Sequence, residues 1–475
     1  MKQKIGLFTG GIETYWKDAG MVELPDLLDR DARRLTAKLG EQFEVVYPGL
    51  AGGPEEAIAC ARAIREAGVD AVVVYHATYV DDAMSLAVLD ELGPGIFPIH
   101  LHSQGIKGIP ETEDLLESGT AWGNNSSVQI CGTLKRMRPD LHFGYVFGDF
   151  DNPAVYEEIG EYARAWRCVR ELKGRQIRYL PHRCACVPMY DTFPDDTKMM
   201  AQTGVEIGFL TTLQLMDEMD AVPESETDAL YKEMTSLCDV IEPTEDEVRL
   251  SCRLSIGLER LVEKFNVDAL AIEFAPEIME RTGMLPALGM ARLIDKGLVV
   301  ATEGDLSVSV GGLMLQSLAG KPIHFWEHLM FDEEKNQVLG GHEGGSAGFT
   351  MARKDYRPKL RSTQYVDFRH MPKTSLNGVL PEFITDPGPV TIVNLFLGRD
   401  GYEMRIATGR SIDTPPRPVH FEHTIVEPDA PLKDYFTRMK EIGVCHHFGL
   451  VHAEVAPELQ KVADMLGMPC EMLTD

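Results

Sequence analysis

Residues 70–75, with the sequence Asp-Ala-Val-Val-Val-Tyr, form a short apolar run rich in β-branched side chains. Such a run is typical of a strand that is buried on both faces of a parallel sheet. Helical patterns lie on either side of it, at Pro54–Ala67 before Gly68 and at Asp81–Leu92 before Gly93, and glycine commonly follows the end of a helix. A buried strand between two helices predicts βαβ units and therefore a parallel sheet.

The same alternation extends through the first third of the chain. It predicts further strands at Lys4–Phe8, Phe43–Tyr47, Ile96–Leu101 and Phe143–Phe147, and further helices at Val22–Leu39 and Ala121–Arg136. We therefore predict that residues 1–167 form a doubly wound α/β domain.

A second doubly wound α/β domain is predicted over residues 168–319. Its predicted elements are the strands Gln176–Pro181, Ala269–Phe274 and Leu298–Ala301 and the helices Asp246–Phe265 and Leu285–Lys296.

The pattern changes near residue 320, where Pro, Gly and His become more frequent. Two strand-like runs, Val390–Leu397 and Tyr402–Thr408, flank a turn that contains Asp-Gly, which predicts a hairpin. Helices are predicted only at Leu432–Ile442 and Ala456–Leu466. The predicted fold class is α/β, with two doubly wound parallel-sheet domains followed by a mostly antiparallel, barrel-like β domain over residues 320–475.

The composition restricts the class of partner. The chain has 46 Lys and Arg against 74 Asp and Glu, a formal net charge of −28, so it repels nucleic acid and anionic membrane surfaces. Its apolar runs are far shorter than the ~20 residues of a membrane-spanning helix. The N-terminus leads directly into a strand without a signal-peptide pattern. We expect a cytoplasmic protein with no nucleic-acid and no membrane partner.

The nine cysteines stand at irregular spacing, which indicates reduced thiols rather than a disulfide framework. His182, Cys184 and Cys186 form the one tight group. This group can bind a metal, but no second Cys or His pair stands nearby in the sequence to complete four ligands. We predict buried, unreactive thiols there.

Two glutamates in the last third are candidates for chemistry. Glu303 directly follows the apolar run Leu298–Thr302, at the carboxyl end of a predicted strand, where open α/β sheets bind ligands; a merely solvated carboxylate is the alternative. Glu327 lies between Phe325-Trp326 and Leu329-Met330. A carboxylate in such an apolar setting is costly unless it is paired or bound to a metal.

Histidines are concentrated in the same region. His342 lies among glycines whose backbone can approach a ligand closely, although a flexible surface loop is the alternative. His446 and His447 are adjacent, and because neighbouring side chains of a strand point to opposite faces, at most one of them is expected to face a site. Two carboxylates and two imidazoles suit a divalent ion such as Mn²⁺, Mg²⁺, Co²⁺ or Zn²⁺, with positions left open for substrate.

Residues 284–293, Met-Leu-Pro-Ala-Leu-Gly-Met-Ala-Arg-Leu, are followed by a predicted strand and by Glu303-Gly304-Asp305. This segment resembles the LPGLAVQRL … AEGDW segment of the L-arabinose isomerase branch of the L-arabinose/L-fucose isomerase superfamily. Phe325-Trp326-Glu327, Gly341-His342 and His446-His447-Phe448 are similar to the stretches that carry the second glutamate and the two metal-binding histidines of that family. Weaker similarity includes residues 75–79 and 100–104.

The resemblance implies a metal-dependent aldose–ketose isomerase. It would convert an open-chain sugar, of the L-arabinose to L-ribulose type or a related pentose or hexose, through an enediol. Glu303 and Glu327 would be the catalytic acid and base, and they would bind Mn²⁺, or another cation such as Co²⁺ or Mg²⁺, together with His342 and His447.

The resemblance also implies a homo-oligomer, a hexamer, in which a neighbouring subunit contributes substrate contacts; Tyr15, Tyr79 and Gln104 are the candidates. Two sugar-contacting stretches differ from the family, because residues 124–130 contain no histidine and residues 10–15 do not match its GSQHLYG stretch. The alternatives are an L-fucose-isomerase-like enzyme on a 6-deoxy or other hexose, a non-catalytic sugar-binding protein on the same scaffold, and a metal-dependent hydrolase.

Overall fold

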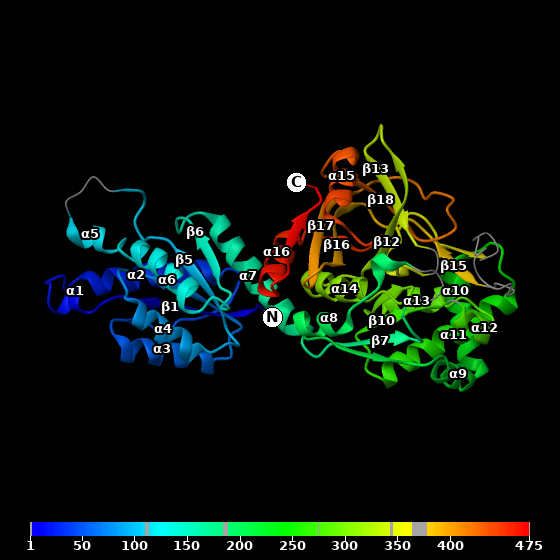
Figure 1. The fold of residues 1–475 in the computed structure, drawn as a ribbon, viewed down its shortest axis with the longest axis horizontal. Coiled ribbons are helices and arrows are strands. Elements are labelled where there is room, and N and C mark those ends of the chain that lie inside the picture. The colour runs from blue at the N-terminus through cyan, green and yellow to red at the C-terminus, as the bar shows by residue number, and fades with distance from the viewer. Residues whose placement is uncertain are drawn as a thin grey trace. The chain divides into compact units, whose positions relative to one another are not determined.

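The computed structural model describes residues 2–109, 114–183, 189–274, 276–342, 345–362 and 378–474. The chain forms two compact units, Met1–Arg167 and Cys168–Asp475, and Figure 1 labels the elements of both. Each unit is described by itself.

The N-terminal unit contains a parallel sheet with the strand order β2-β1-β4-β5-β6, and β3 pairs with the end of β1. Val72 and Val74 of β4 pack with α3, α4 and α6 in one apolar cluster, and every residue of β4 is buried. Figure 1 shows α2 and α3 on opposite sides of β1. The strands are β1 (Lys4–Gly10), β2 (Glu44–Val46), β3 (Leu50–Ala51), β4 (Ala71–His76), β5 (Phe97–His102) and β6 (Gly144–Phe147), and the helices are α1 (Thr14–Lys17), α2 (Leu24–Leu39), α3 (Pro54–Glu66), α4 (Asp82–Leu92), α5 (Leu115–Gly119), α6 (Gly123–Met137) and α7 (Pro153–Leu172).

The C-terminal unit begins with a second parallel sheet, in the order β11-β10-β7-β8. The last residues of β7, β10 and β11, which are Leu180, Ile272 and Thr302, lie side by side in the register. The carboxyl ends of these strands therefore share one edge. The strands are β7 (Gln176–Leu180), β8 (Glu206–Phe209), β10 (Ala269–Ile272) and β11 (Val299–Thr302), and the helical elements are η1 (Tyr190–Thr192), α8 (Asp196–Thr203), α9 (Thr212–Asp220), α10 (Glu224–Leu237), α11 (Glu245–Lys264), α12 (Glu277–Thr282), α13 (Ala287–Asp295) and α14 (Leu306–Ala319).

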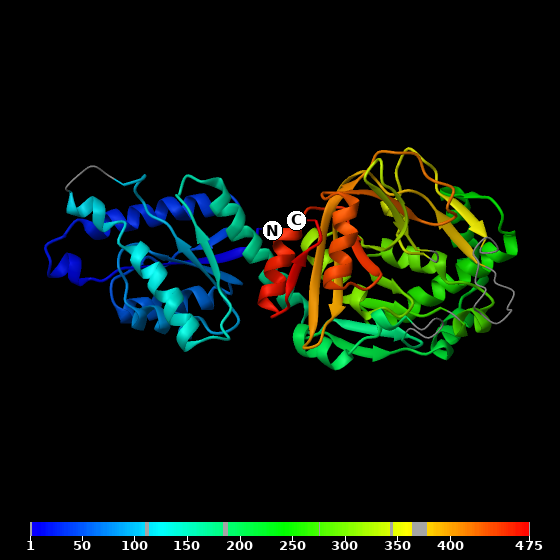
Figure 2. The ribbon, with the colours of Figure 1, turned by 45° about the horizontal axis from the view of Figure 1, so that its top comes forward.

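A closed barrel follows in the same unit, and Figure 2 shows its strands from a second direction. Its strand order is β16-β19-β12-β13-β18-β17, and the ring closes because β17 pairs back to β16. These pairings are antiparallel, and β20 adds to β17 in parallel. The elements are β12 (His324–Asp332), β13 (Gln337–Gly341), β16 (Gly388–Leu397), β17 (Tyr402–Ser411), β18 (His423–Pro428), β19 (His447–Val451), β20 (Cys470–Met472), α15 (Leu432–Ile442) and α16 (Ala456–Met465), and a small sheet contains β9 (Asp239–Val240), β14 (Lys359–Ser362) and β15 (Val379–Glu382).

The predicted fold class is confirmed, including the hairpin at the Asp-Gly turn, which is β16 and β17. Helix α14 was not predicted from the sequence, because most of its residues are buried and a helix without a polar face lacks the periodic pattern. It packs against β10 and β11 on one side and against β16 and β19 of the barrel. Because α14 ends at Ala319 and β12 begins at His324, we propose residues 168–319 and 320–475 as domains within this unit.

Candidate metal centre

Glu303 lies in the turn between β11 and α14. Its φ of +54° is in the left-handed region, as is the φ of +63° at Gly304, and such a conformation is uncommon for a residue other than glycine. Asp305 then caps α14, because its Oδ1 accepts a hydrogen bond of 2.8 Å from the backbone N–H of Val308. The turn therefore places Glu303 at the carboxyl edge of the parallel sheet.

The barrel register brings the other predicted residues together. His447 of β19 pairs with Glu327 of β12, and Glu327 pairs with Gly341 of β13, directly before His342. Directly opposed residues on neighbouring antiparallel strands have Cβ atoms about 5 Å apart. Residues that are about a hundred positions apart in the chain become neighbours in this way.

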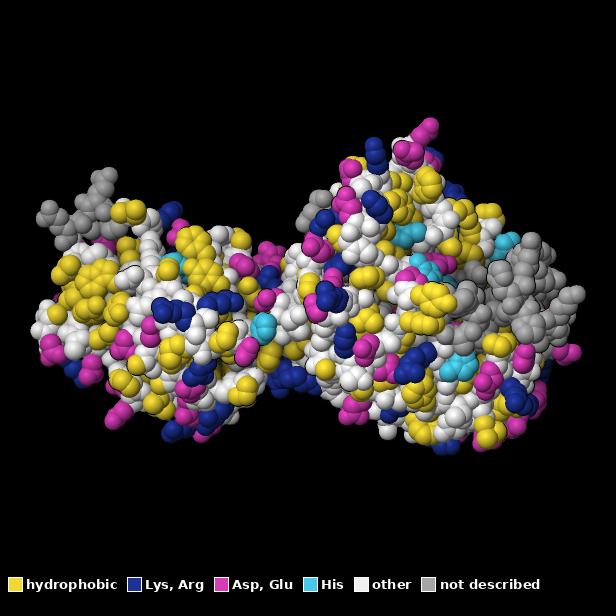
Figure 3. Space-filling model, in the orientation of Figure 1, with side chains coloured by type: hydrophobic (Ala, Val, Ile, Leu, Met, Phe, Trp, Pro, Cys, Tyr) yellow, Lys and Arg dark blue, Asp and Glu magenta, His cyan; other side chains and the backbone are white. Residues whose placement is uncertain are grey.

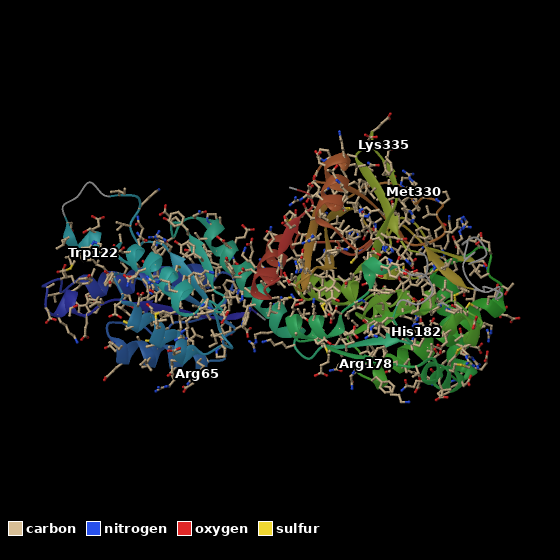
Figure 4. The ribbon with its side chains drawn as sticks, viewed as in Figure 1. Arg65, Trp122, Arg178, His182, Met330 and Lys335 are labelled. Atoms are coloured by element: carbon tan, nitrogen blue, oxygen red, sulfur yellow. The ribbon has the colours of Figure 1, made fainter. Side chains whose placement is uncertain are left out.

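The side chains of Glu303 and the two histidines converge. Oε2 of Glu303 lies 3.3 Å from Nε2 of His447, and Oε1 lies 3.8 Å from Nε2 of His342. Oε2 of Glu327 lies 4.0 Å from the same Nε2 of His447. Possible ligand atoms of Glu303, His342 and His447 all lie within 4.8 Å of one another. Figure 3 shows histidine and acidic side chains close together on the visible face of the C-terminal unit. Figure 4 labels Met330, which lies three residues after Glu327 on β12.

Asp305, which the sequence analysis did not single out, orients His447. Nδ1 of His447 lies 2.9 Å from Oδ2 of Asp305, and both side chains are about 1% exposed. With Nδ1 bonded to a carboxylate, Nε2 faces Glu303 and Glu327. Among the described residues this Nε2 is buried and makes no hydrogen bond. A carboxylate that holds one imidazole nitrogen while the other faces a site is the usual support of a metal-binding histidine.

The electrostatics of the cluster favour positive charge at its centre. Burial by itself would raise the pKa of Glu303, but His447 and His342 lower it to about 2. Burial would likewise lower the pKa of His447, but Asp305 and Glu303 raise it to about 10. The contact between Glu303 and His447 contributes to both shifts, because each group stabilises the charged form of the other. An oxygen and nitrogen donor set around a buried nitrogen that makes no hydrogen bond among the described residues fits a divalent cation.

His446 also lies at this cluster, contrary to the expectation that only one of the two adjacent histidines would do so. The ring centroids of His446 and His447 are 4.0 Å apart, and possible ligand atoms of Glu327, His446 and His447 lie within 4.8 Å of one another. The expectation assumed a strand at both positions, whereas β19 begins at His447. His446 is held by Asp191, whose Oδ2 lies 2.6 Å from Nδ1 of His446.

The predicted substrate contacts are in the N-terminal unit, where the structure brings them near one another. Tyr15 and Tyr79 line a cavity of about 600 Å³ together with Trp122, Asn124 and Asn125. The rings of Tyr15 and Trp122 are 5.2 Å apart, edge to face, and Figure 4 labels Trp122. Gln104 accepts a hydrogen bond of 2.8 Å from Asn124. Aromatic faces and side-chain amides are groups that bind polar ligands with apolar faces.

The alternative metal group at residues 182–186 gains no support. His182, labelled in Figure 4, lies 3.9 Å from Glu277, and Cys184 and Cys186 lie outside the described residues. The described cysteines are free, and Cys168, Cys238, Cys252 and Cys445 are buried.

In the part of the chain that the structure describes, no helix is long and apolar enough to cross a membrane.

The chain is similar to known sugar isomerases. The family model described as the L-arabinose isomerase central domain matches residues 192–319, which include Glu303 and Asp305. The sulfoquinovose isomerase of Alkalicoccus urumqiensis is 23% identical over 409 residues, which cover 84% of this chain and 85% of that protein. The sulfoquinovose isomerase of Priestia aryabhattai is 21% identical over 406 residues, covering 84% of each chain. The L-arabinose isomerase of Geobacillus stearothermophilus is 21% identical over 460 residues, covering 91% of this chain and 87% of that protein.

Proposed function

We infer that this chain interconverts an aldose and a ketose with a divalent cation at Glu303. The chain is a sugar isomerase of an L-arabinose isomerase-like family. The observation that carries the cation is the convergence of Glu303, Glu327 and His342 on the buried Nε2 of His447. That nitrogen has no hydrogen-bond partner among the described residues.

Glu303, Glu327, His342 and His447 would hold the cation, for which we propose Mn²⁺ first, with Co²⁺ or Mg²⁺ as substitutes. When bound, the cation would polarise the carbonyl of the open-chain sugar and hold two neighbouring oxygens. Asp305 supports this arrangement, because it fixes the ring of His447 through Nδ1.

Glu303 and Glu327 are proposed as the acid and the base. Isomerisation needs one group that removes the proton from C2 and one that delivers a proton to C1. The two carboxylates lie 3.3 Å and 4.0 Å from the same nitrogen of His447, so a sugar bound beside that point lies within reach of both. They are also partly accessible, with about 16% and 19% of their side chains exposed.

The substrate is proposed to be an open-chain pentose or hexose. The relatives include L-arabinose isomerases and sulfoquinovose isomerases. L-Arabinose and the sulfonated hexose sulfoquinovose are therefore the two sugars to test first. The changed stretches at residues 10–15 and 124–130 favour a sugar other than L-arabinose, because they supply Tyr15, Asn124 and Asn125 to the lining of the cavity. We propose that this cavity, with Gln104, contacts the sugar bound by a neighbouring copy in a homohexamer, and that the enzyme works in the cytoplasm.

A sugar screen tests the proposal. The purified protein, stripped and then reloaded with Mn²⁺, is incubated with L-arabinose, sulfoquinovose, and panels of other pentoses, hexoses and 6-deoxyhexoses, and ketose formation is followed. We expect a ketose with the same carbon number from at least one sugar, and none from the Glu303→Gln variant. Binding of a sugar without conversion would favour the non-catalytic alternative, and cleavage of a bond would favour the hydrolase.

A further inference from the structure

We propose that a cavity at one end of the barrel is a second binding site, and that it takes a neutral polyhydroxylated molecule, a sugar or a polyol. The cavity is lined by residues just before β12, just before and within the start of β16, and just after β19, and we call it the mouth cavity. Its volume is about 690 Å³. Small-molecule sites commonly have such volumes, and they occur often in the mouths of β-barrels.

The mouth cavity is separate from the candidate metal centre. Strand β19 lies antiparallel between β12 and β16, so the end of β19 and the starts of β12 and β16 share one end of the barrel. Lys321 and His452 line the cavity at that end. His447 begins β19 and His452 directly follows its last residue, so the two lie about 16 Å apart along the strand.

The charged side chains of the mouth cavity do not pair with one another. Nζ of Lys321 donates a hydrogen bond of 2.6 Å to the carbonyl oxygen of His452. Among the described residues, the carboxylates of Asp386 and Glu454 have neither an ion pair nor a hydrogen bond. The ammonium group of Lys321 can donate two more hydrogen bonds, and the carboxylates can accept several. The cavity therefore offers both donors and acceptors to a ligand.

His452 adds a neutral imidazole to this lining. Both of its ring nitrogens are buried and make no hydrogen bond in the part of the chain that the structure describes. Burial and the nearby Lys321 lower the pKa of His452 to about 4, so at neutral pH one nitrogen donates and the other accepts. No described hydrogen bond holds the ring, so it can turn toward a ligand. A hydroxyl group, which both donates and accepts, would supply the partners that a buried polar group needs.

The lining favours a neutral ligand over an ion. Two carboxylates against one ammonium repel an anion, and Lys321 in the same cavity repels an organic cation. The groups of described residues that could hold a metal ion do not include side chains of this cavity. Pro322, Pro387 and Pro389 supply rigid apolar surface, which suits the C–H groups of a sugar or polyol.

Binding of L-arabinitol to the metal-free protein, measured by calorimetry, tests this site. L-Arabinitol has no carbonyl group and therefore cannot be isomerised. The titration is repeated with Glu303→Gln, which alters the metal centre and leaves the mouth cavity intact. Asp386→Ala removes an acceptor from the cavity, and His452→Phe keeps a ring but removes its nitrogens. Glu334→Ala, in the exposed turn between β12 and β13, is the matched control.

We expect Glu303→Gln and Glu334→Ala to bind L-arabinitol with the Kd of the wild type. Asp386→Ala and His452→Phe should each raise Kd about tenfold, the effect of one lost hydrogen bond. Sodium sulfate and 1,4-diaminobutane, the anionic and cationic probes, should bind more weakly than L-arabinitol.

Three results would overturn the proposal. Absence of L-arabinitol binding by Glu303→Gln would show that the mouth cavity is not a site. A Kd unchanged in Asp386→Ala, or in folded His452→Phe, would place the polyol elsewhere. Asp386→Ala decides this point alone if His452→Phe does not fold, because Asp386 is partly exposed. Tighter binding of either ionic probe would assign the cavity to an ion. These titrations involve no ketose formation, so they stand apart from the sugar screen of the proposed isomerase.

Discussion

The two carboxylate oxygens of Asp305 accept different hydrogen bonds. Oδ1 accepts the hydrogen bond from Val308 that caps α14, and Oδ2 accepts from Nδ1 of His447. Asparagine has one oxygen and one amide group. In Asp305→Asn, the oxygen can keep the cap, but the amide then donates to Nδ1 of His447, so the hydrogen moves to Nε2 and blocks the nitrogen that faces Glu303.

Asp305→Ala affects the helix cap and the imidazole of His447 differently. It removes the cap, which costs about 1 kcal/mol of stability, but it leaves the imidazole free to keep its Nε2 lone pair. We therefore expect one variant to lose mainly metal affinity and the other to lose mainly stability. Asp305→Asn should lose about 10- to 100-fold in metal affinity, or roughly 1.4–2.7 kcal/mol, with near-normal stability of the metal-free protein. Asp305→Ala should be the less stable variant but should bind the metal more tightly than Asp305→Asn.

The assay combines Mn²⁺ titration against a competing chelator with urea unfolding of the metal-free protein. Asp81 supplies the control, because it caps α4 through a 2.8 Å hydrogen bond from Met84 in the N-terminal unit. Asp81→Ala should show the cap loss without any change in metal affinity. Wild-type metal affinity in Asp305→Asn, or weaker metal binding in Asp305→Ala than in Asp305→Asn, would refute the reasoning.

Three further results are expected. Glu303→Gln and Glu327→Gln should each lower kcat by at least about 10²–10⁴-fold while the circular dichroism of the folded protein stays unchanged; retention of turnover would remove that glutamate from the acid/base pair. Chelation should abolish activity and lower Tm, and readdition of Mn²⁺ at 100 times its Kd should restore about 2.7 kcal/mol; full activity in protein shown by elemental analysis to be metal-free would contradict the metal centre. Burial lowers the pKa of His76 to about 4 and that of His100 to about 3, whereas both imidazoles bind a proton near pH 6.5 in the unfolded chain. The free energy of unfolding should therefore fall as the pH falls below 6.5, by about 2 kcal/mol for each histidine at pH 5. Equal stability of the N-terminal unit to urea at pH 7.5 and at pH 5 would contradict this.

Local pattern was sufficient for much of the fold. The run at residues 70–75 predicted β4 to within a residue at each end, because a strand buried on both faces must be apolar throughout. The Asp-Gly turn likewise predicted the pairing of β16 with β17, since that turn joins neighbouring strands directly. Helix α14 was missed for the opposite reason, because most of its residues are buried and its sequence has no continuous polar face to mark its period.

The residue types of the candidate centre were also readable in the sequence. Glu303 follows a buried strand, and Glu327 and His342 stand in unusual local settings, so each could be named from its neighbours. Asp305 and Asp191 could not, because an aspartate before a helix or in a short turn reads as an ordinary cap or a solvated side chain. The start of β19 at His447, which leaves His446 outside the strand alternation, was likewise not marked by any local pattern.

The sequence by itself determined several of the buried strands, the class of fold and the donor atoms available to a metal. Only the tertiary structure decided which donors meet. Glu327 and His447 become neighbours through the hydrogen-bond register between β12 and β19, which are far apart in the chain. His447 presents Nε2 to Glu303 because Asp305, at the start of another helix, holds Nδ1. Register and ring orientation arise from contacts between distant segments, and such contacts leave no periodic trace in the residues on either side of them.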